Sequence, residues 1–205
     1  MSANSTRAFA AMAWCLLASS GRLHAENPYA HLTQRIAALA GLAAPAGEEV
    51  RVWSVSDAAD QNYVIVLRRE AAGVRGQVVR WWPARYAPDP KWLPPGWRCA
   101  RHVVQPDLRL CRAAFDKQPD WAALLRDFEG DDVWSLPDGS DLQKKDKDTL
   151  AHGASLTVEL LRSGASRAYT YPLPQFLTGP HAVKAERIRA RSSAFIGMID
   201  KSGAR

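Results

Sequence analysis

The chain has 205 residues, of which 47% are hydrophobic and 23% charged, and its formal net charge is +6. These values are typical of a folded domain with its own core and exclude a disordered or low-complexity chain. The basic residues are scattered, without a run of five or more, so we predict no binding to nucleic acid.

Residues 1–25 have the pattern of a secretory signal peptide. Arg7 is followed by an apolar run over residues 8–17. Leu23-His24-Ala25, which resembles an A-x-A cleavage site, ends the segment. The run is shorter than the ~20 apolar residues that span a bilayer, although an uncleaved N-terminal anchor is an alternative. No later segment is apolar enough to cross a membrane. We therefore predict a periplasmic or secreted protein, without a membrane span after signal removal, whose residues 26–205 form a single domain.

The first half of this domain is predicted to hold a helix and a β-meander. Residues 26–44 favour a short helix, because one apolar stripe recurs with helical spacing at Tyr29, Leu32, Ile36 and Leu39. Strands are expected around residues 50–55, 62–69 and 74–82, the last two joined by a turn. Neither face of the third strand is cleanly apolar, which predicts a sheet with one face only partly covered.

Five prolines in residues 83–95 interrupt this pattern. Proline cannot donate to a strand ladder, so this segment is predicted to be an irregular surface excursion. A second hairpin is then expected, with strands at residues 98–104 and 108–115 on either side of Gln105.

Cys99 and Cys111 lie at equal distances from Gln105 in this hairpin. An antiparallel pairing places them opposite each other, which predicts a disulfide bond. The alternative is a pair of buried free thiols, which exported proteins seldom keep. Zinc is not expected, because the two cysteines and His102 lack the close spacing of structural zinc sites.

The second half is predicted to contain two helices and a third hairpin. A helix over residues 119–129, capped by Asp116, has a clear apolar stripe and ends at Gly130. Strands at residues 155–162 and 167–171 follow, and an amphipathic helix over residues 180–199 closes the chain. The predicted fold class is α+β: an antiparallel sheet of six or seven strands built from hairpins, with an N-terminal helix, a central helix and a C-terminal helix packed on it.

The sequence contains no recognisable catalytic set. The histidines of residues 26–205 are isolated, and no Gly-x-Ser-x-Gly motif or phosphate-binding glycine loop is present. A cysteine nucleophile would require Cys99 or Cys111 to stay reduced, which an oxidising compartment opposes. We therefore predict a non-enzymatic protein without catalytic residues, cofactor or metal.

Acidic residues leave two alternatives to that prediction. A carboxylate-based envelope hydrolase could draw on Glu129, Asp131, Asp132 and Glu159. The simpler interpretation is that Asp131 and Asp132 are solvated at a helix end and that Glu159 lies on the solvent-exposed face of a strand. The acidic residues within 138–148 could suggest calcium, but they lack the order of an EF-hand loop and are interleaved with lysines.

An aromatic segment is the strongest candidate for a binding surface. Four of the eight tryptophans lie between residues 81 and 97, interleaved with proline and arginine. Tryptophan and arginine on a stiff loop are typical of an interaction hot spot, although the same tryptophans could fill the core. The candidate binding residues are Trp81, Trp82, Arg85, Tyr86, Trp92 and Trp97. A second aromatic group around Tyr169 and Tyr171 is more typical of a structural corner.

These patterns together resemble a group of exported bacterial domains without an established activity. The resemblance covers most of residues 26–205 and rests on Arg51-Val52-Trp53, the Gly76–Trp82 return strand, Cys99 and Cys111, Trp121 with Leu124-Leu125, Trp134-Ser135-Leu136-Pro137, Gly153-Ala154-Ser155, and Tyr169, Tyr171 and Pro174-Gln175. It implies an exported location but no catalytic or binding residue.

The combined expectation is a non-enzymatic exported protein that binds an envelope protein partner. An inhibitor or immunity-type protein of an envelope-acting enzyme fits its small size, its disulfide and its aromatic segment. The alternative is a module that binds glycan or peptidoglycan, since tryptophan rings also stack on sugars.

Overall fold

The computed structural model describes residues 30–42, 47–56, 62–94, 96–101, 108–115, 117–139, 154–162 and 165–202. The predicted signal peptide, the possible cleavage site and most of the acidic segment 138–148 lie outside these ranges. In the described ranges, no helix is long and apolar enough to cross a membrane.

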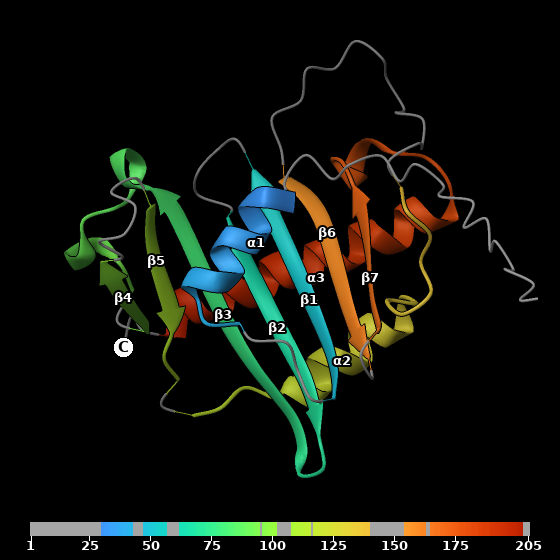
Figure 1. Cartoon of the computed structure of the whole chain (residues 1–205), viewed down its shortest axis with the longest axis horizontal. Helices are drawn as coiled ribbons and strands as arrows, with labels where there is room; N and C mark the ends of the chain where they lie inside the picture. The colour runs from blue at the N-terminus through green and yellow to red at the C-terminus, as the bar shows by residue number, and fades with distance from the viewer. Residues whose placement is uncertain are drawn as a thin grey trace, which may run out of the picture.

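Seven strands form one antiparallel sheet, in which the order is β4-β5-β3-β2-β1-β6-β7 (Figure 1). Each pair of neighbouring strands is antiparallel, which confirms the predicted arrangement of hairpins. The strands are β1 (Glu48–Ser56), β2 (Tyr63–Glu70), β3 (Gly73–Pro83), β4 (Trp97–Arg101), β5 (Leu108–Ala113), β6 (Ala154–Arg162) and β7 (Ala165–Tyr171). The β1–β2–β3 meander forms the centre, and the two later hairpins extend it on opposite sides.

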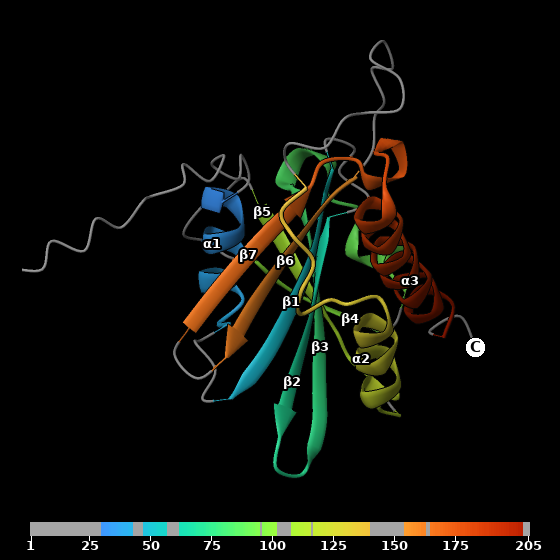
Figure 2. The ribbon, with the colours of Figure 1, turned by 90° about the vertical axis from the view of Figure 1, so that its right-hand side faces the viewer.

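Helices cover both faces of the sheet (Figure 2). Helix α1 (Ala30–Leu39) lies on one face, whereas α2 (Trp121–Gly130) and α3 (Pro180–Ser202) lie on the other. Short 3₁₀ turns occur at η2 (Ala84–Tyr86), η3 (Pro90–Trp92) and η4 (Pro174–Phe176). The predicted α+β class, with an N-terminal, a central and a C-terminal helix, is therefore confirmed.

The ends of the central helix differ in detail from the prediction. Helix α2 begins at Trp121, and the side chain of Asp120 accepts a hydrogen bond from Ala123 N. The predicted cap, Asp116, lies outside the described residues. Gly130 is the last helical residue, and Asp131 follows it as the C-cap. A carboxylate at the N-cap satisfies an amide that has no partner inside the helix.

The core is divided between the two faces of the sheet. Beneath α1, Ile36 packs with alternate residues of the central strands, such as Trp53 and Val64. The larger cluster, on the opposite face, joins residues such as Val52 and Ile65 to α2 and α3. Because β-strand side chains alternate between faces, helices on both sides bury consecutive strand residues.

The β3 strand crosses from a partly covered region into the core. Its first five residues are exposed or half-buried, whereas Val78, Val79, Trp81 and Trp82 are buried. The predicted partial cover therefore applies to one end of this strand rather than to a whole sheet face.

Candidate interaction surface

The six residues predicted to bind a partner fall into two groups. Trp81, Trp82 and Trp97 are buried, and Trp81 has only 1% of its surface exposed. In contrast, Trp92 is 75% exposed and Tyr86 is 58% exposed, and Arg85 is also exposed. A contact surface can therefore be built only from the second group, while the first group packs the interior.

The buried tryptophans hold three parts of the chain together. Trp81 packs edge-on against Trp53, with ring centroids 5.8 Å apart, in the core beneath α1. On the opposite face, the guanidinium of Arg80 lies 5.1 Å from the ring centroid of Trp82 and 5.4 Å from that of Trp97. This arginine is therefore held between two indole rings.

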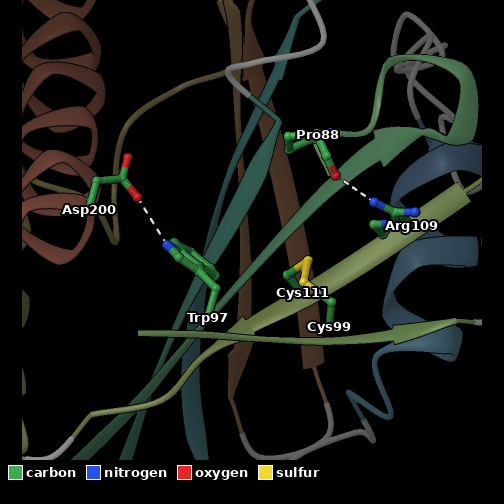
Figure 3. The surroundings of a disulfide bond; sticks show 6 residues. All are labelled: Pro88, Trp97, Cys99, Arg109, Cys111 and Asp200. Atoms are coloured by element: carbon green, nitrogen blue, oxygen red, sulfur yellow. Dashed lines mark hydrogen bonds between the residues drawn. A yellow bond between two sulfur atoms is a disulfide. The ribbon is translucent and has the colours of Figure 1, made fainter. Parts of the chain in front are cut away.

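The carboxylate of Asp200, near the end of α3, completes this arrangement. It accepts a hydrogen bond of 3.0 Å from Trp97 Nε1 (Figure 3). It also lies 3.0 Å from a guanidinium nitrogen of Arg80. One acidic side chain therefore fixes strand β3 and strand β4 to the last helix.

Residues 84–92, which we call the aromatic loop, carry the exposed group. The guanidinium of Arg85 lies 4.6 Å from the ring centroid of Tyr86, and the ammonium of Lys91 lies 5.6 Å from that of Trp92. Asp89 shapes the second half of the loop, because its carboxylate accepts from Lys91 N and its carbonyl from Trp92 N. Each exposed aromatic ring therefore has a cation beside it.

Contacts with the neighbouring hairpin support the loop from both sides. Arg109 of β5 donates a hydrogen bond to the carbonyl oxygen of Pro88 (Figure 3). After the loop, Trp97 N donates to Pro94 O over 3.0 Å. The aromatic rings are thus presented from a backbone that is already ordered by hydrogen bonds.

The predicted disulfide lies at the base of this region. Cys99 of β4 and Cys111 of β5 are directly opposite in the sheet and are joined by an S–S bond of 2.03 Å (Figure 3). The pairing that the hairpin symmetry predicted is therefore confirmed. A disulfide of this kind is typical of proteins in oxidising compartments.

The same hairpin concentrates positive charge. Arg98 lies opposite Arg112, and Arg101 lies opposite Arg109, while neither β4 nor β5 contains an acidic residue. Arg109 donates a hydrogen bond to the main-chain carbonyl of Pro88, and Arg112 donates one to that of Ala40. These acceptors are uncharged, so they do not neutralise the two arginines. Like charges placed directly opposite each other repel, so this part of the sheet favours an anionic neighbour.

The four acidic residues considered for hydrolysis do not converge. Glu129, Asp131 and Asp132 lie at the end of α2, on the face covered by α2 and α3. Glu159 lies on β6, and its neighbour Val158 belongs to the core of that same face, so alternation directs Glu159 to the opposite face. The sheet therefore separates Glu159 from the other three carboxylates.

Each acid at the end of α2 is engaged by a cation. Glu129 pairs with Arg69 at 2.6 Å, and the exposed Asp132 pairs with Lys184 of α3. Hydrogen bonding to Lys184 is the main cause that lowers the pKa of Asp132. These contacts connect α2 to the sheet and to α3.

The expectation that Asp131 is solvated is wrong. Its side chain is buried and lies 2.5 Å from a guanidinium nitrogen of Arg187 and 2.8 Å from one of Arg191. Both arginines belong to α3, so this carboxylate fixes the end of α2 onto that helix. Its partners are distant in sequence, and no local pattern around Asp131 indicates them.

A buried ionic cluster on the α1 face escaped the sequence analysis altogether. Glu49 has no exposed surface, and its two carboxylate oxygens lie 2.6 Å from guanidinium nitrogens of Arg51 and Arg68. Arg51 also lies 3.7 Å from Glu159, whose pKa is raised by burial. The alternation of charge at residues 49 and 51 marks one strand face, and is the signal that could have indicated this cluster.

Tyr169 and Tyr171 connect β7 to the segment that follows α2. Their hydroxyls donate hydrogen bonds of 2.7 Å to the carbonyls of Val133 and Pro137, respectively. Gly139 lies against the ring of Tyr171, where a larger residue would collide. These contacts agree with the structural corner that the sequence favoured over a second binding surface.

An apolar groove of about 460 Å³ between α2 and α3 is a competing surface. Leu124 and Phe195 line it, and Met198, which is 60% exposed, lies at its edge. Unlike the aromatic loop, this groove lies between two helices and carries no exposed aromatic ring among its lining residues. It therefore provides a comparison for experiments on the loop.

Comparison with protein-family models, with curated proteins and with solved structures finds no match. The resemblance to exported bacterial domains therefore stays a prediction, and function must be argued from the geometry of this chain alone.

Proposed function

We propose that the protein is an exported, non-enzymatic binding protein and that the aromatic loop is its contact surface for a protein partner. The observation that carries the proposal is the pair of exposed rings, Trp92 and Tyr86, on a loop fastened to the β4–β5 hairpin. Exposed tryptophan and tyrosine with neighbouring cations are the residue types that dominate binding energy at protein interfaces.

The support for this surface is structural as well as chemical. A loop that is ordered before binding loses little conformational entropy on association, so more of its contact energy contributes to affinity. The hydrogen bond from Arg109 to Pro88 and the disulfide at the base both supply such order. The disulfide also supports an exported location, because such bonds persist in oxidising compartments.

The test compares two exposed apolar side chains on different surfaces. The variants Trp92→Ala and Met198→Ala each shorten one such residue, in the aromatic loop and in the α2–α3 groove respectively. Each is used as bait, together with the wild-type protein, in envelope extracts of the source organism, after thermal unfolding has shown equal stability. We expect a partner that the wild-type protein and the Met198 variant retain and that the Trp92 variant loses.

Two outcomes would contradict the proposal. If all three baits retain the same proteins, the aromatic loop is not the contact surface. If the wild-type protein instead co-sediments with purified peptidoglycan and the Trp92 variant does not, the loop binds glycan rather than protein. An inhibitor role would be supported if the retained partner were an envelope enzyme whose activity falls when the wild-type protein is added.

A further inference from the structure

Strand β4 ends the sheet beside the aromatic loop (Figure 1). In the part of the chain that the structure describes, β5 is the only strand that pairs with it, which leaves its outer edge without a neighbouring strand. Such an edge presents main-chain donors and acceptors that can pair with an added strand.

The hydrogen-bond register shows which residues face outward. Ala114 N donates to Gly96 O, so these opposite residues form a hydrogen-bonded pair. The two pair types alternate along an antiparallel ladder, which makes Cys99 and Arg101 members of non-hydrogen-bonded pairs. Their amide and carbonyl groups therefore point away from β5. Trp97 also belongs to a non-hydrogen-bonded pair, and its outward amide donates to Pro94 O.

The charge of this region specifies the kind of strand that fits. Arg98 is exposed and lies opposite Arg112, and the aromatic loop adds Arg85 and Lys91. Between residues 84 and 113 the chain has six basic and two acidic residues, so this stretch supplies most of the net positive charge. An acidic strand beside β4 would lie in a favourable field.

A second copy of this chain is a poor occupant of the same edge. Pairing β4 with β4 of another molecule would bring the arginines of one strand next to those of the other. Like charges on neighbouring strands are destabilising. The charge therefore favours a different protein over self-association.

We propose that the partner adds an extended, acidic segment to the outer edge of β4, where it pairs with the main chain of Cys99 and Arg101 beside Trp92. This inference rests on the proposed function and specifies how the partner binds. The main-chain bonds would supply affinity, and the arginines and exposed rings would select the sequence of the segment.

The probe for the first experiment is a short synthetic peptide that alternates glutamate and valine, with a lysine–valine peptide as the control. Amide hydrogen exchange is measured on the wild-type protein with and without each peptide. We expect the acidic peptide to slow exchange at Cys99 and Arg101, and to leave Arg98 unchanged because its amide already faces β5. Equal effects of both peptides, or no slowing at Cys99 and Arg101, would overturn the proposal.

The second experiment separates main-chain pairing from charge. Arg101→Pro removes one outward amide without removing a bond to β5, and edge strands tolerate proline at such positions. Arg101→Ala removes the same charge and keeps the amide. We expect the proline variant to bind the acidic peptide about tenfold more weakly than the alanine variant, since one main-chain hydrogen bond is lost.

Several results distinguish the failure of strand addition from the failure of the proposed function. Equal peptide affinities of the proline and alanine variants would overturn strand addition, even if the Trp92 variant still loses its partner in extracts. If a polyuronate at the same concentration of negative charge displaces the peptide, the edge of β4 binds anions in general. That result would also overturn strand addition. Retention of the partner by the Trp92 variant would instead contradict the proposed function. Circular dichroism and the intact disulfide serve as controls for folding.

Discussion

At the scale of single residues, Arg80 and Asp131 are held by partners that lie in distant parts of the chain. Arg80 lies between two indole rings and a carboxylate, and Asp131 lies between two arginines of α3. A buried charge is tolerated only when such partners surround it. These residues are therefore sensitive points of the fold, although they are polar.

Glu49 provides the first test at this scale. The substitution Glu49→Gln removes a fully buried negative charge and leaves the nearly buried Arg51 without its closest carboxylate. We expect the free energy of unfolding to fall by about 3 kcal/mol, as when one partner of a buried ion pair is removed. Urea denaturation measures this change. A loss as small as that of an exposed pair, such as Glu70 with Arg75, would contradict the structural role of the cluster.

Tyr171 gives a prediction for alkaline pH. Burial, with a smaller contribution from Asp138, raises its pKa from 10.0 to about 12. The folded state therefore holds the phenol proton more tightly than the unfolded state does. The resulting stability is fully present below pH 10 and is lost as the pH rises from 10 to about 12.

The variant Tyr171→Phe isolates this effect. At neutral pH it should be less stable by about 1 kcal/mol, because the hydrogen bond to Pro137 is lost. The difference from the wild-type protein should shrink between pH 10 and 12, where only the wild-type protein has this group to titrate. Urea denaturation across that range measures it, and a constant difference would show that Tyr171 does not couple ionisation to folding.

At the scale of elements, the packing of α2 against the sheet depends on one glycine. Gly76 of β3 lies directly beneath the ring of Trp121, and a Cβ atom there would collide with the ring. The first residue of α2 can therefore approach the strand only because position 76 has no side chain. This close approach explains why a glycine is kept within a strand.

The variant Gly76→Ala should lower the free energy of unfolding by about 2 kcal/mol, since the ring and the strand must separate. The matched variant Gly130→Ala introduces the same methyl group at the end of α2, where nothing lies within 4 Å. It should leave stability unchanged or raise it slightly. Thermal and urea unfolding of both variants measure the contrast, and equal losses would exclude the collision as the cause.

The elements were largely predictable from sequence, whereas their burial was not. Periodicity located all three helices and the hairpins, and symmetry about Gln105 paired Cys99 with Cys111. Trp81 and Trp82 point to opposite faces of β3, and both are buried because helices cover both faces there. The placement of α1 and α3 is a tertiary property that neighbouring residues do not encode.

The candidate surface was predictable to a similar degree. The run of tryptophan, proline and arginine located the aromatic loop, but it did not distinguish the exposed Trp92 from the buried Trp97. That distinction depends on Asp200, which lies more than half the chain away in sequence and binds the indole of Trp97. Sequence therefore identified the loop, and tertiary contacts determined which of its rings remain exposed.

At the scale of the whole molecule, α3 connects the two halves of the fold. Its residues contact α2 through Asp131, strand β2 through the hydrogen bond between Ser193 and Tyr63, and strand β4 through Asp200. Burial raises the pKa of Tyr63 at this contact. Helix α3 therefore connects the end of the sheet beside the aromatic loop to the rest of the fold.

The variant Asp200→Asn tests that connection. It weakens the contact with Arg80 and leaves an uncharged acceptor for Trp97, so we expect a loss of about 1 kcal/mol in the free energy of unfolding. Amide exchange at Trp97 and in the aromatic loop should become faster, while exchange in β6 and β7 should not change. Uniform acceleration across the sheet would show that Asp200 contributes to global stability only.

The strand order also limits the sequence of steps in which the sheet can assemble. Strand β1 is an interior strand of the sheet, and its second neighbour is β6, where Glu49 pairs with Leu161. When the chain folds from its N-terminus, the β1–β2–β3 meander can form early, but the second edge of β1 stays unpaired until β6 (Ala154–Arg162) has been made. Such non-local pairing slows folding and leaves a strand edge open to aggregation in the meantime. The open edge of β1 is therefore the part of the sheet most exposed to mispairing before β6 is in place.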